Sequence, residues 1–378
     1  MGVALDWFKS YLSDRKQCVS IGNALSSFRS IDIGVPQGSV LGPILFLLYI
    51  NDLPNATEML PFLFADDTTA VESGPNLPQL FQKVNLEFQK LGEWFRANKL
   101  SLHPGKTKYS IFCNPEKKID NDNLHIYFNN NDIESPTQDQ NLIRPLECVY
   151  HSSEVPAIKF LGVYIDQFLN FKYHTKKISN KLSSALFCLR RCKNILTDST
   201  LKTLYFSTFH CHLIYALLAW GSANKSVLDP IIKKQKCAIR IISRAPYNAH
   251  TEPLFKKHEI LRFEDLYIAS VIQFMHSYMF GKLPSSFHGT WVLNRSRNTV
   301  TAGLRTASEL FIPRYRINFA ARLPLHFFPK VWNDITDNKL KNTTNVETFK
   351  NNLKKYFLDD MASEVRCDRP FCRDCYPE

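Results

Sequence analysis

The sequence predicts an α+β fold, in which a region that contains a β-hairpin is followed by a longer, mostly helical part. Two short β-prone runs, Met59–Ala65 and Thr68–Val71, flank adjacent carboxylates and indicate a hairpin. Apolar residues then recur at helical spacing after residue 77, and again among basic side chains after residue 172. A chain of 378 residues can bury a sizeable core in two or three domains.

The predicted hairpin carries Asp66 and Asp67 at its turn, where Asp tolerates the backbone geometry. No Lys or Arg lies between Asn51 and Gln82. Adjacent carboxylates without a nearby cation repel each other, so a metal ion is the obvious neutralising partner. Polymerases use two Mg²⁺ ions about 3.5–4 Å apart to activate a 3′-hydroxyl and stabilise pyrophosphate. For the pair alone, a solvated Asp-Asp turn is the simpler interpretation.

A loop strongly punctuated by glycine and proline, Gly34–Pro43, precedes the hairpin. Glycine permits close approach of the backbone to a ligand, and Gln37 offers both donors and an acceptor. The loop leads into Ile44–Ile50, an uncharged run of helix length. A helix that is apolar all round is expected to be buried in a core. The loop and the Asp pair at this spacing are far more specific together than either is alone.

Together these segments resemble the palm of reverse transcriptases from non-LTR retrotransposons such as the jockey group. The resemblance implies an RNA-directed DNA polymerase that uses an RNA template, a DNA primer, dNTPs, and Mg²⁺ or Mn²⁺. It implies that the loop and the following Ser39–Ile50 helix support the template and the incoming nucleotide. The residues it implies for template and nucleotide are Pro36, Gln37, Gly38 and Phe64, and those for the metal are Asp66 and Asp67.

Two further motifs carry the resemblance downstream. Leu77–Phe95 has the spacing of an amphipathic helix, expected on the outer face of the palm. Lys106 then matches a lysine proposed to protonate the leaving pyrophosphate. By itself a solvated lysine is the favoured interpretation, and in this register the two interpretations are about equal. Lys159–Asp166 resembles the primer-grip hairpin, although its composition alone indicates only a strand. The residues implied to position the primer 3′ end are Phe160, Leu161 and Gly162.

The resemblance and the composition together predict three regions. Residues 1–167 form a partial reverse transcriptase palm with a polar insertion at about 114–157, expected to be a partly disordered surface loop. Residues 168–245 form a basic helical thumb, and residues 246–378 form a helical region with a Cys-containing tail. Two apolar helix faces are predicted in this last region, made by Ile268, Val271, Ile272, Met275 and Met279, and by Phe349, Leu353, Tyr356 and Phe357.

The basic charge is concentrated. Residues 156–250 hold 15 Lys and Arg against three Asp, which accounts for the whole net charge of +12. Basic helix faces suit a nucleic-acid backbone and bind it with salt-sensitive, sequence-independent affinity, whereas a solvated face is the usual explanation of one isolated cluster. A second cluster, Lys233–Arg244, is interleaved with isoleucine. The residues expected to contact the backbone are Lys172, Lys176, Lys177, Lys181, Arg190, Arg191 and Lys193.

The first palm motif of the family carries another metal-binding aspartate, upstream of the loop. In that motif an apolar, strand-like run precedes the aspartate, and no such run precedes Asp6 or Asp14. We therefore expect a 5′-truncated element or a shortened gene model, without fingers, endonuclease or the complete metal site. Three hypotheses stay open: a polymerase, a non-catalytic nucleic-acid-binding remnant, and a decayed fragment that folds poorly.

No signal peptide and no run of 18 or more apolar residues is found, so neither secretion nor membrane spanning is expected. Ten scattered cysteines favour a reducing compartment, nuclear or cytoplasmic. Cys367, Cys372 and Cys375 could supply three zinc ligands, but no fourth Cys or His follows before Glu378. An unpaired or partnered tail is therefore favoured over a zinc site.

Overall fold

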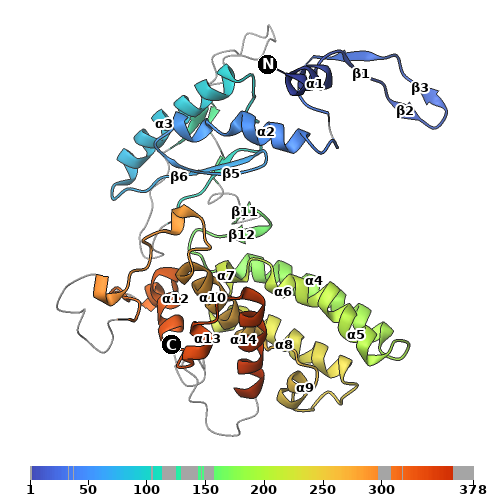
Figure 1. The fold of residues 1–378 in the computed structure, drawn as a ribbon, viewed down its shortest axis with the longest axis vertical. Helices are drawn as coiled ribbons and strands as arrows, with labels where there is room; N and C mark the ends of the chain where they lie inside the picture. Colours follow the sequence, from blue (N-terminus) through green and yellow to red (C-terminus); the bar gives the residue numbers. More distant parts are fainter. Residues whose placement is uncertain are drawn as a thin grey trace. The chain divides into compact units, whose positions relative to one another are not determined.

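The computed structural model describes residues 2–32, 34–36, 38–103, 105–112, 125–128, 144–145, 147–148, 157–296, 308–316 and 318–360. Most of the predicted polar insertion and the Cys367–Cys375 cluster lie outside these residues. The chain divides into two compact units, Met1–Ser110 with Glu116–Val149, and Ile111–Pro115 with Tyr150–Glu378. Helices and small sheets occur together, as the predicted α+β class requires (Figure 1).

The described residues of the first unit hold three α-helices, one 3₁₀ helix and a set of two-stranded sheets. Its helices are α1 (Val3–Leu12), α2 (Gly42–Ile50), the 3₁₀ helix η1 (Leu53–Ala56) and α3 (Leu77–Ala97). Its strands are β1 (Arg15–Gln17), β2 (Ser20–Ile21), β3 (Ala24–Leu25), β4 (Arg29–Ile31), β5 (Leu60–Phe64), β6 (Asp67–Val71), β7 (Lys108–Tyr109), β8 (Tyr127–Phe128), β9 (Arg144–Pro145) and β10 (Glu147–Cys148). The pairs β1–β4, β2–β3, β5–β6 and β8–β9 are antiparallel, and β7–β10 is parallel.

The predicted amphipathic helix is confirmed as α3. The side chain of Asn76 caps its start by accepting a hydrogen bond from the Gln79 amide at 3.2 Å. The apolar face of α3 packs on η1 and the β5–β6 hairpin, in a small core centred on Ile50, Leu53, Met59 and Leu91. This core is what holds the hairpin against the helix.

The expectation that Ile44–Ile50 is buried on all sides is wrong. Helix α2 forms as predicted, but only Gly42 and Ile50 are buried, while Ile44 and Leu48 are 51% and 69% exposed. One face reaches the small core through Ile50 and Phe46. The described residues of this unit place no second layer on the opposite face, so composition alone overestimated burial.

The second unit begins with a hairpin and continues as a helical assembly. The hairpin strands are β11 (Ile158–Phe160) and β12 (Val163–Ile165), which pair antiparallel. The longer helices are α4 (Lys172–Cys192), α5 (Asp198–Tyr205), α8 (Lys225–Ile242), α10 (Phe263–Met279), α12 (Pro324–Asn333) and α14 (Val346–Asp360). The shorter ones are η2 (Phe206–His210), α6 (Cys211–Ile214), α7 (Leu217–Trp220), α9 (Glu252–Lys257), η3 (Ser285–Phe287), η4 (Asn294–Ser296), η5 (Asn318–Arg322) and α13 (Asn338–Lys341).

The core of the second unit forms where α4 lies along α8 and where α10 packs against α6, α7, α12 and α14 (Figure 1). The apolar stripe predicted on α4 is buried in full: Ile178, Leu182, Ala185, Leu186 and Leu189. Buried Gln235 of α8 is satisfied, because its side-chain amide donates to Tyr205 and Leu261 and accepts from the Phe263 amide.

The two apolar faces predicted further along are confirmed for most of their residues. On α10, Val271, Ile272 and Met275 are buried, whereas Met279 is 38% exposed near the helix end. On α14, the buried residues are Phe349, Leu353 and Phe357, and Tyr356 faces outward.

Candidate functional site

The predicted Asp-Asp hairpin is present, and its carboxylates lie at its tip. Strands β5 and β6 pair from Leu60↔Val71 to Phe64↔Asp67, so Ala65 and Asp66 form a two-residue turn. Ala65 has φ of +52°, a conformation that costs a non-glycine residue on the order of 1–3 kcal/mol. Asp66 and Asp67 are both exposed. The turn therefore presents two adjacent carboxylates to solvent on a strained but well-paired hairpin.

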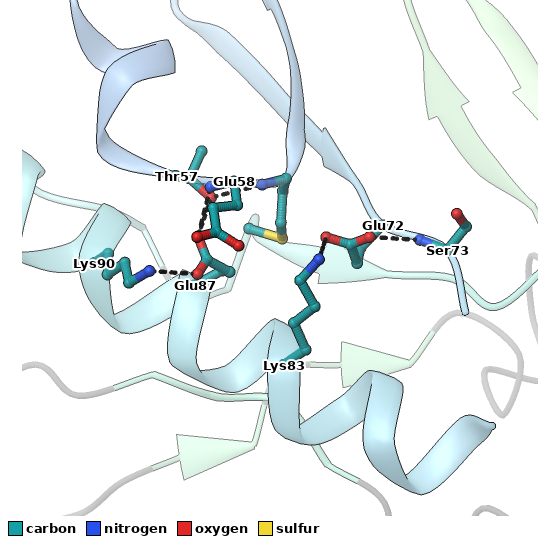
Figure 2. A network of polar contacts seen from close by, with 8 residues as sticks. Thr57, Glu58, Glu72, Ser73, Lys83, Glu87 and Lys90 are labelled. Atoms are coloured by element: carbon teal, nitrogen blue, oxygen red, sulfur yellow. Dashed lines mark hydrogen bonds and ion pairs between the residues drawn. The ribbon is translucent and has the colours of Figure 1, made fainter. Parts of the chain in front are cut away.

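Helix α3 holds the base of this hairpin at both strands (Figure 2). Before β5, the Glu87 carboxylate accepts hydrogen bonds from the Glu58 amide at 2.6 Å and the Thr57 hydroxyl at 2.9 Å. After β6, the Lys83 ammonium lies 2.9 Å from the Glu72 carboxylate. These contacts hold the start of β5 and the end of β6 against α3. They thereby set the direction in which the hairpin tip points.

Glu87 is the stronger of these two anchors. Its side chain is buried, and its second oxygen lies 2.6 Å from the Lys90 ammonium. The Lys90 ammonium and the Glu58 amide together lower the pKa of the Glu87 carboxyl to about 2. Glu72 also has a lowered pKa because of the hydrogen bond from Lys83, but Lys83 is 46% exposed. An exposed partner makes that pair weaker.

The Pro36–Gly42 loop is organised by Ser39. The Ser39 hydroxyl donates to the Pro36 carbonyl at 2.8 Å and accepts from the Gly42 amide at 3.1 Å and the Tyr11 hydroxyl at 2.6 Å. A Cβ on Gly42 would lie 2.9 Å from the Ser39 Oγ, and Gly38 has φ of +80°. Glycine is thus required at Gly42 by space and favoured at Gly38 by backbone geometry.

The remaining sequence-predicted residues of the first unit are solvent-facing or only partly covered. Phe64 is 62% exposed, Lys106 is exposed and Pro36 is half-buried. Gln37 lies outside the described residues. The turn before Lys106 is closed by a hydrogen bond from its amide to the His103 carbonyl at 3.0 Å. Lys106 therefore stays a prediction from the resemblance.

The Asp66–Asp67 pair fits part of a Mg²⁺ site. Both groups offer the oxygen ligands that Mg²⁺ prefers, and in the part of the chain that the structure describes neither forms an ion pair or hydrogen bond. Within the same described residues, no three His, Cys, Asp or Glu side chains gather closely enough to hold a metal ion. A Mg²⁺ site at this tip would need further ligands beside these two carboxylates.

The predicted primer-grip residues form a second tight hairpin, β11–β12, in the other unit. Leu161 and Gly162 are its two turn residues, with φ of +43° and +85°. Positive φ at both central positions is the signature of a type I′ turn. Val163 is buried in the helical core, which anchors the hairpin to the second unit. The turn itself is more open, since Gly162 is exposed.

Asp166 shapes the chain between this hairpin and α4. One carboxylate oxygen accepts from the amides of Phe168 and Asn170 at 3.1 and 3.0 Å, and the other accepts from the Phe171 amide at 2.6 Å. Leu169 and Phe171 in this connection both have positive φ. The carboxylate compensates this strained backbone and sets the start of α4.

His174 of α4 contacts the hairpin from the other side. Its Nδ1 accepts a hydrogen bond from the Tyr164 amide at 3.3 Å, and its ring packs on Trp220 with 5.4 Å between centroids. Burial lowers the pKa of the His174 imidazole to about 4, with a smaller effect from Lys181. A neutral imidazole is what the Nδ1 acceptor role requires.

The basic residues predicted on α4 are largely open to a ligand, although the Arg190 guanidinium donates to Cys237 Sγ of α8 at 3.3 Å. All of them are exposed except Lys193, which is half-buried at the helix end. The Lys177 ammonium lies 5.2 Å from the centre of the Tyr173 ring, so a cation and an aromatic face occur together near the start of α4.

The second basic cluster is largely used within the protein. The Lys234 ammonium donates to the Ser179 carbonyl and to the hydroxyls of Ser179 and Ser183 at 2.6–2.7 Å, which joins α8 to α4. Arg240 donates to the Ala249 carbonyl, and Arg244 pairs with Asp198. Only part of this cluster is therefore left to contact phosphates.

Sequence reasoning missed the supporting residues around both hairpins: Ser39, Glu87, His174 and Tyr215. Glu87 occupies a charged position within an apolar helix face, which is a usable signal. The sequence gives no sign of the contact made by Tyr215, whose hydroxyl donates to the Leu161 carbonyl at 2.6 Å from 54 residues away in the chain.

Residues 1–165 match the family model described as reverse transcriptase (RNA-dependent DNA polymerase). This segment contains the Pro36–Gly42 loop, the Asp66–Asp67 turn and the β11–β12 hairpin, and it is a reverse transcriptase domain. The curated relatives below place it with the jockey-like elements of non-LTR retrotransposons.

Three relatives illustrate this similarity. The probable RNA-directed DNA polymerase from transposon BS of Drosophila melanogaster is 28% identical over 63% of this chain and 25% of its own length. The RNA-directed DNA polymerase from mobile element jockey of Drosophila funebris is 25% identical over 65% of this chain and 26% of its own length. The probable RNA-directed DNA polymerase from transposon X-element of D. melanogaster is 24% identical over 78% and 29%.

The chain thus spans little more than a quarter of the length of these relatives. No solved structure matches the chain significantly. In the described part of the chain, no helix has the length and apolar character needed to cross a membrane.

Proposed function

We propose that this chain binds an RNA template with its DNA primer and takes part in RNA-directed DNA synthesis at Asp66 and Asp67. The observation that carries the proposal is the hairpin tip: two adjacent, exposed carboxylates with no cationic partner among the described residues, on a base anchored by Glu87. This tip lies within the segment matched by the reverse transcriptase model.

Each region has a defined task in this proposal. Asp66 and Asp67 would hold divalent ions, which would supply charge neutralisation at the phosphates and activation of the primer 3′-hydroxyl. The Pro36–Gly38 loop supports the template and the dNTP, and Lys106 supplies a proton to pyrophosphate. The β11–β12 turn holds the primer end, and the exposed lysines and arginines of α4 neutralise backbone phosphates.

A second candidate is a chain that binds primer–template but does not extend it by itself. Two observations favour it: the described residues contain no cluster of three metal-binding side chains, and the exposed basic face of α4 lies in the other unit from the Asp pair. Phosphoryl transfer depends on positioning and charge neutralisation, so an incomplete ligand set leaves binding without synthesis.

Primer extension on an RNA template with Mg²⁺ tests both candidates. The wild-type chain is compared with Asp66→Ala/Asp67→Ala and with Asp52→Ala, an exposed aspartate of the same unit. Binding of primer–template is measured in parallel at several salt concentrations. Extension by the wild type and Asp52→Ala, but not by the double variant, supports synthesis at the Asp pair.

Salt-sensitive binding without extension by any variant supports the binding-only candidate. Extension that survives in the double variant refutes the assignment of Asp66 and Asp67. Absence of both binding and extension refutes both candidates.

A further inference from the structure

The β11–β12 turn is held by a contact from a residue far along the chain. Leu161 adopts φ of +43°, which a residue with a branched side chain rarely does. Strain of this kind persists only where the surroundings hold it in place. The structure shows what does so here.

Tyr215 is the residue that touches the turn. It lies between α6 and α7, and its hydroxyl donates to the Leu161 carbonyl at 2.6 Å. Its ring passes so close to the turn that a Cβ on Gly162 would lie 3.2 Å from it. One residue thus fixes the turn by a hydrogen bond and limits its sideways movement by contact.

The backbone that presents Tyr215 is itself held in place. The helix breaks at Tyr215, and the next residue, Ala216, has φ of +49°. The indole of Trp220 donates to the Tyr215 carbonyl at 2.9 Å, and Trp220 is fully buried. The position of the Tyr215 ring is therefore set by the helical core.

The same tryptophan reaches the other side of the hairpin. The ring of Trp220 packs against His174, whose Nδ1 accepts the hydrogen bond from the Tyr164 amide in β12. The turn and one strand of the hairpin are thus connected to one buried side chain through separate partners. Tyr215 itself remains 53% exposed, so its ring contributes little to the core.

We propose that Tyr215 is a positioning residue, which sets the Leu161–Gly162 turn relative to the helical unit and thereby places the primer 3′ end. The inference rests on the proposed function, in which this turn holds the primer. It predicts that loss of the Tyr215 hydroxyl alters contact with the terminal nucleotide while leaving overall binding of the duplex intact.

The test uses the full chain and the variant Tyr215→Phe, which removes only the hydroxyl. The matched control is Tyr247→Phe, because Tyr247 is 89% exposed and contacts Arg240 through its ring. The probe is an RNA template annealed to a DNA primer that carries 4-thiothymidine at its 3′ end, or ten nucleotides upstream. Photocrosslinks are mapped by mass spectrometry, which requires no catalysis.

In the wild type and Tyr247→Phe, the 3′ probe is expected to crosslink to residues 158–165. In Tyr215→Phe this crosslink falls about fivefold, as expected for loss of one hydrogen bond worth about 1 kcal/mol. The dissociation constant and the upstream crosslink stay within about twofold, because the phosphate contacts that supply most affinity are unchanged.

Three outcomes overturn the inference, and they differ from one another. An unchanged 3′ crosslink in Tyr215→Phe shows that the hydroxyl positions nothing, although the proposed function stands. Loss of binding and of both crosslinks shows a merely structural role for Tyr215. A wild type that binds primer–template without any 3′ crosslink to the hairpin refutes the assignment of the hairpin in the proposed function, and this inference with it.

Discussion

Replacing Glu87 by Gln tests how the Asp-bearing hairpin is fixed to α3. The substitution keeps the shape of the side chain and one carbonyl acceptor for the Glu58 amide, but removes the charge that pairs with Lys90. Each hydrogen bond to a charged group contributes about 1.5–3 kcal/mol to the free energy of unfolding. The amide oxygen of Gln retains part of this contribution. The variant should therefore lower the free energy of unfolding of the first unit.

The pKa sets an upper limit on the effect. Folding lowers the pKa of the Glu87 carboxyl from 4.5 to about 2. At about 1.4 kcal/mol per pKa unit, this shift corresponds to about 3 kcal/mol of folding stability at neutral pH. The Lys90 side chain is 51% exposed, so solvent screens part of the attraction between Lys90 and Glu87. We expect a loss of about 1–2 kcal/mol for Glu87→Gln at pH 7.

The sign of the pH dependence follows from the lowered pKa. The stabilisation by Glu87 is fully present above the unfolded-state pKa of 4.5 and is lost as the pH falls from there through about 2. The difference between wild type and Glu87→Gln should therefore shrink across this window.

The assay is hydrogen–deuterium exchange in increasing urea, read on peptides covering residues 57–72, so that the first unit is followed separately from the second. Glu93→Gln is the matched control, because Glu93 is an exposed residue of the same helix. It should change stability by less than about 0.5 kcal/mol. Equal effects of the two substitutions at pH 7, or a Glu87→Gln effect that persists undiminished near pH 2, would refute the reasoning.

Three further predictions follow from the same geometry. Gly42→Ala brings a methyl group within 2.9 Å of Ser39 Oγ and should destabilise the first unit by about 1–3 kcal/mol in urea unfolding. Lys177→Met should reduce the slope of log binding constant for nucleic acid against log salt concentration by about one. Lys234→Met should leave that slope unchanged and destabilise the second unit, because the Lys234 ammonium is bonded within the protein. His174 should titrate in NMR with a pKa of about 4. The unfolded chain binds that proton nearer pH 6.5, so acidification between these values should lower the stability of the second unit.

Local patterns predicted the helices and the first hairpin well. The spacing of Leu77 to Phe95 and the stripe from Ile178 to Leu189 each fixed a helix and its buried face, because burial of one face is a property of a short segment. The turn at Asp66 was readable for the same reason: two β-prone runs separated by turn residues pair with each other.

Two features could not be predicted from the sequence: how much of a helix is buried, and which residues far apart in the chain contact each other. The apolar run at Ile44–Ile50 predicted a buried helix, but burial depends on what other segments supply, and here they cover one face. The split of basic residues into exposed and internally bonded ones, such as Lys177 and Lys234, depends on where α4 meets α8. Neither fact is encoded within a window of a few residues.

The two hairpins share one physical arrangement, a strained turn on a supported hairpin. Each has a two-residue turn with a non-glycine residue at positive φ, Ala65 in one and Leu161 in the other. Each is held by polar contacts from its own unit, through Glu87 of α3 in the first and through Tyr215, between α6 and α7, in the second. Tyr215 bonds directly to the strained residue Leu161, whereas Glu87 holds the first hairpin at its base, at the far end of β5 from Ala65. Loosening either support should therefore move the turn residues before it unfolds the unit, which is the behaviour expected of positioning rather than of core packing.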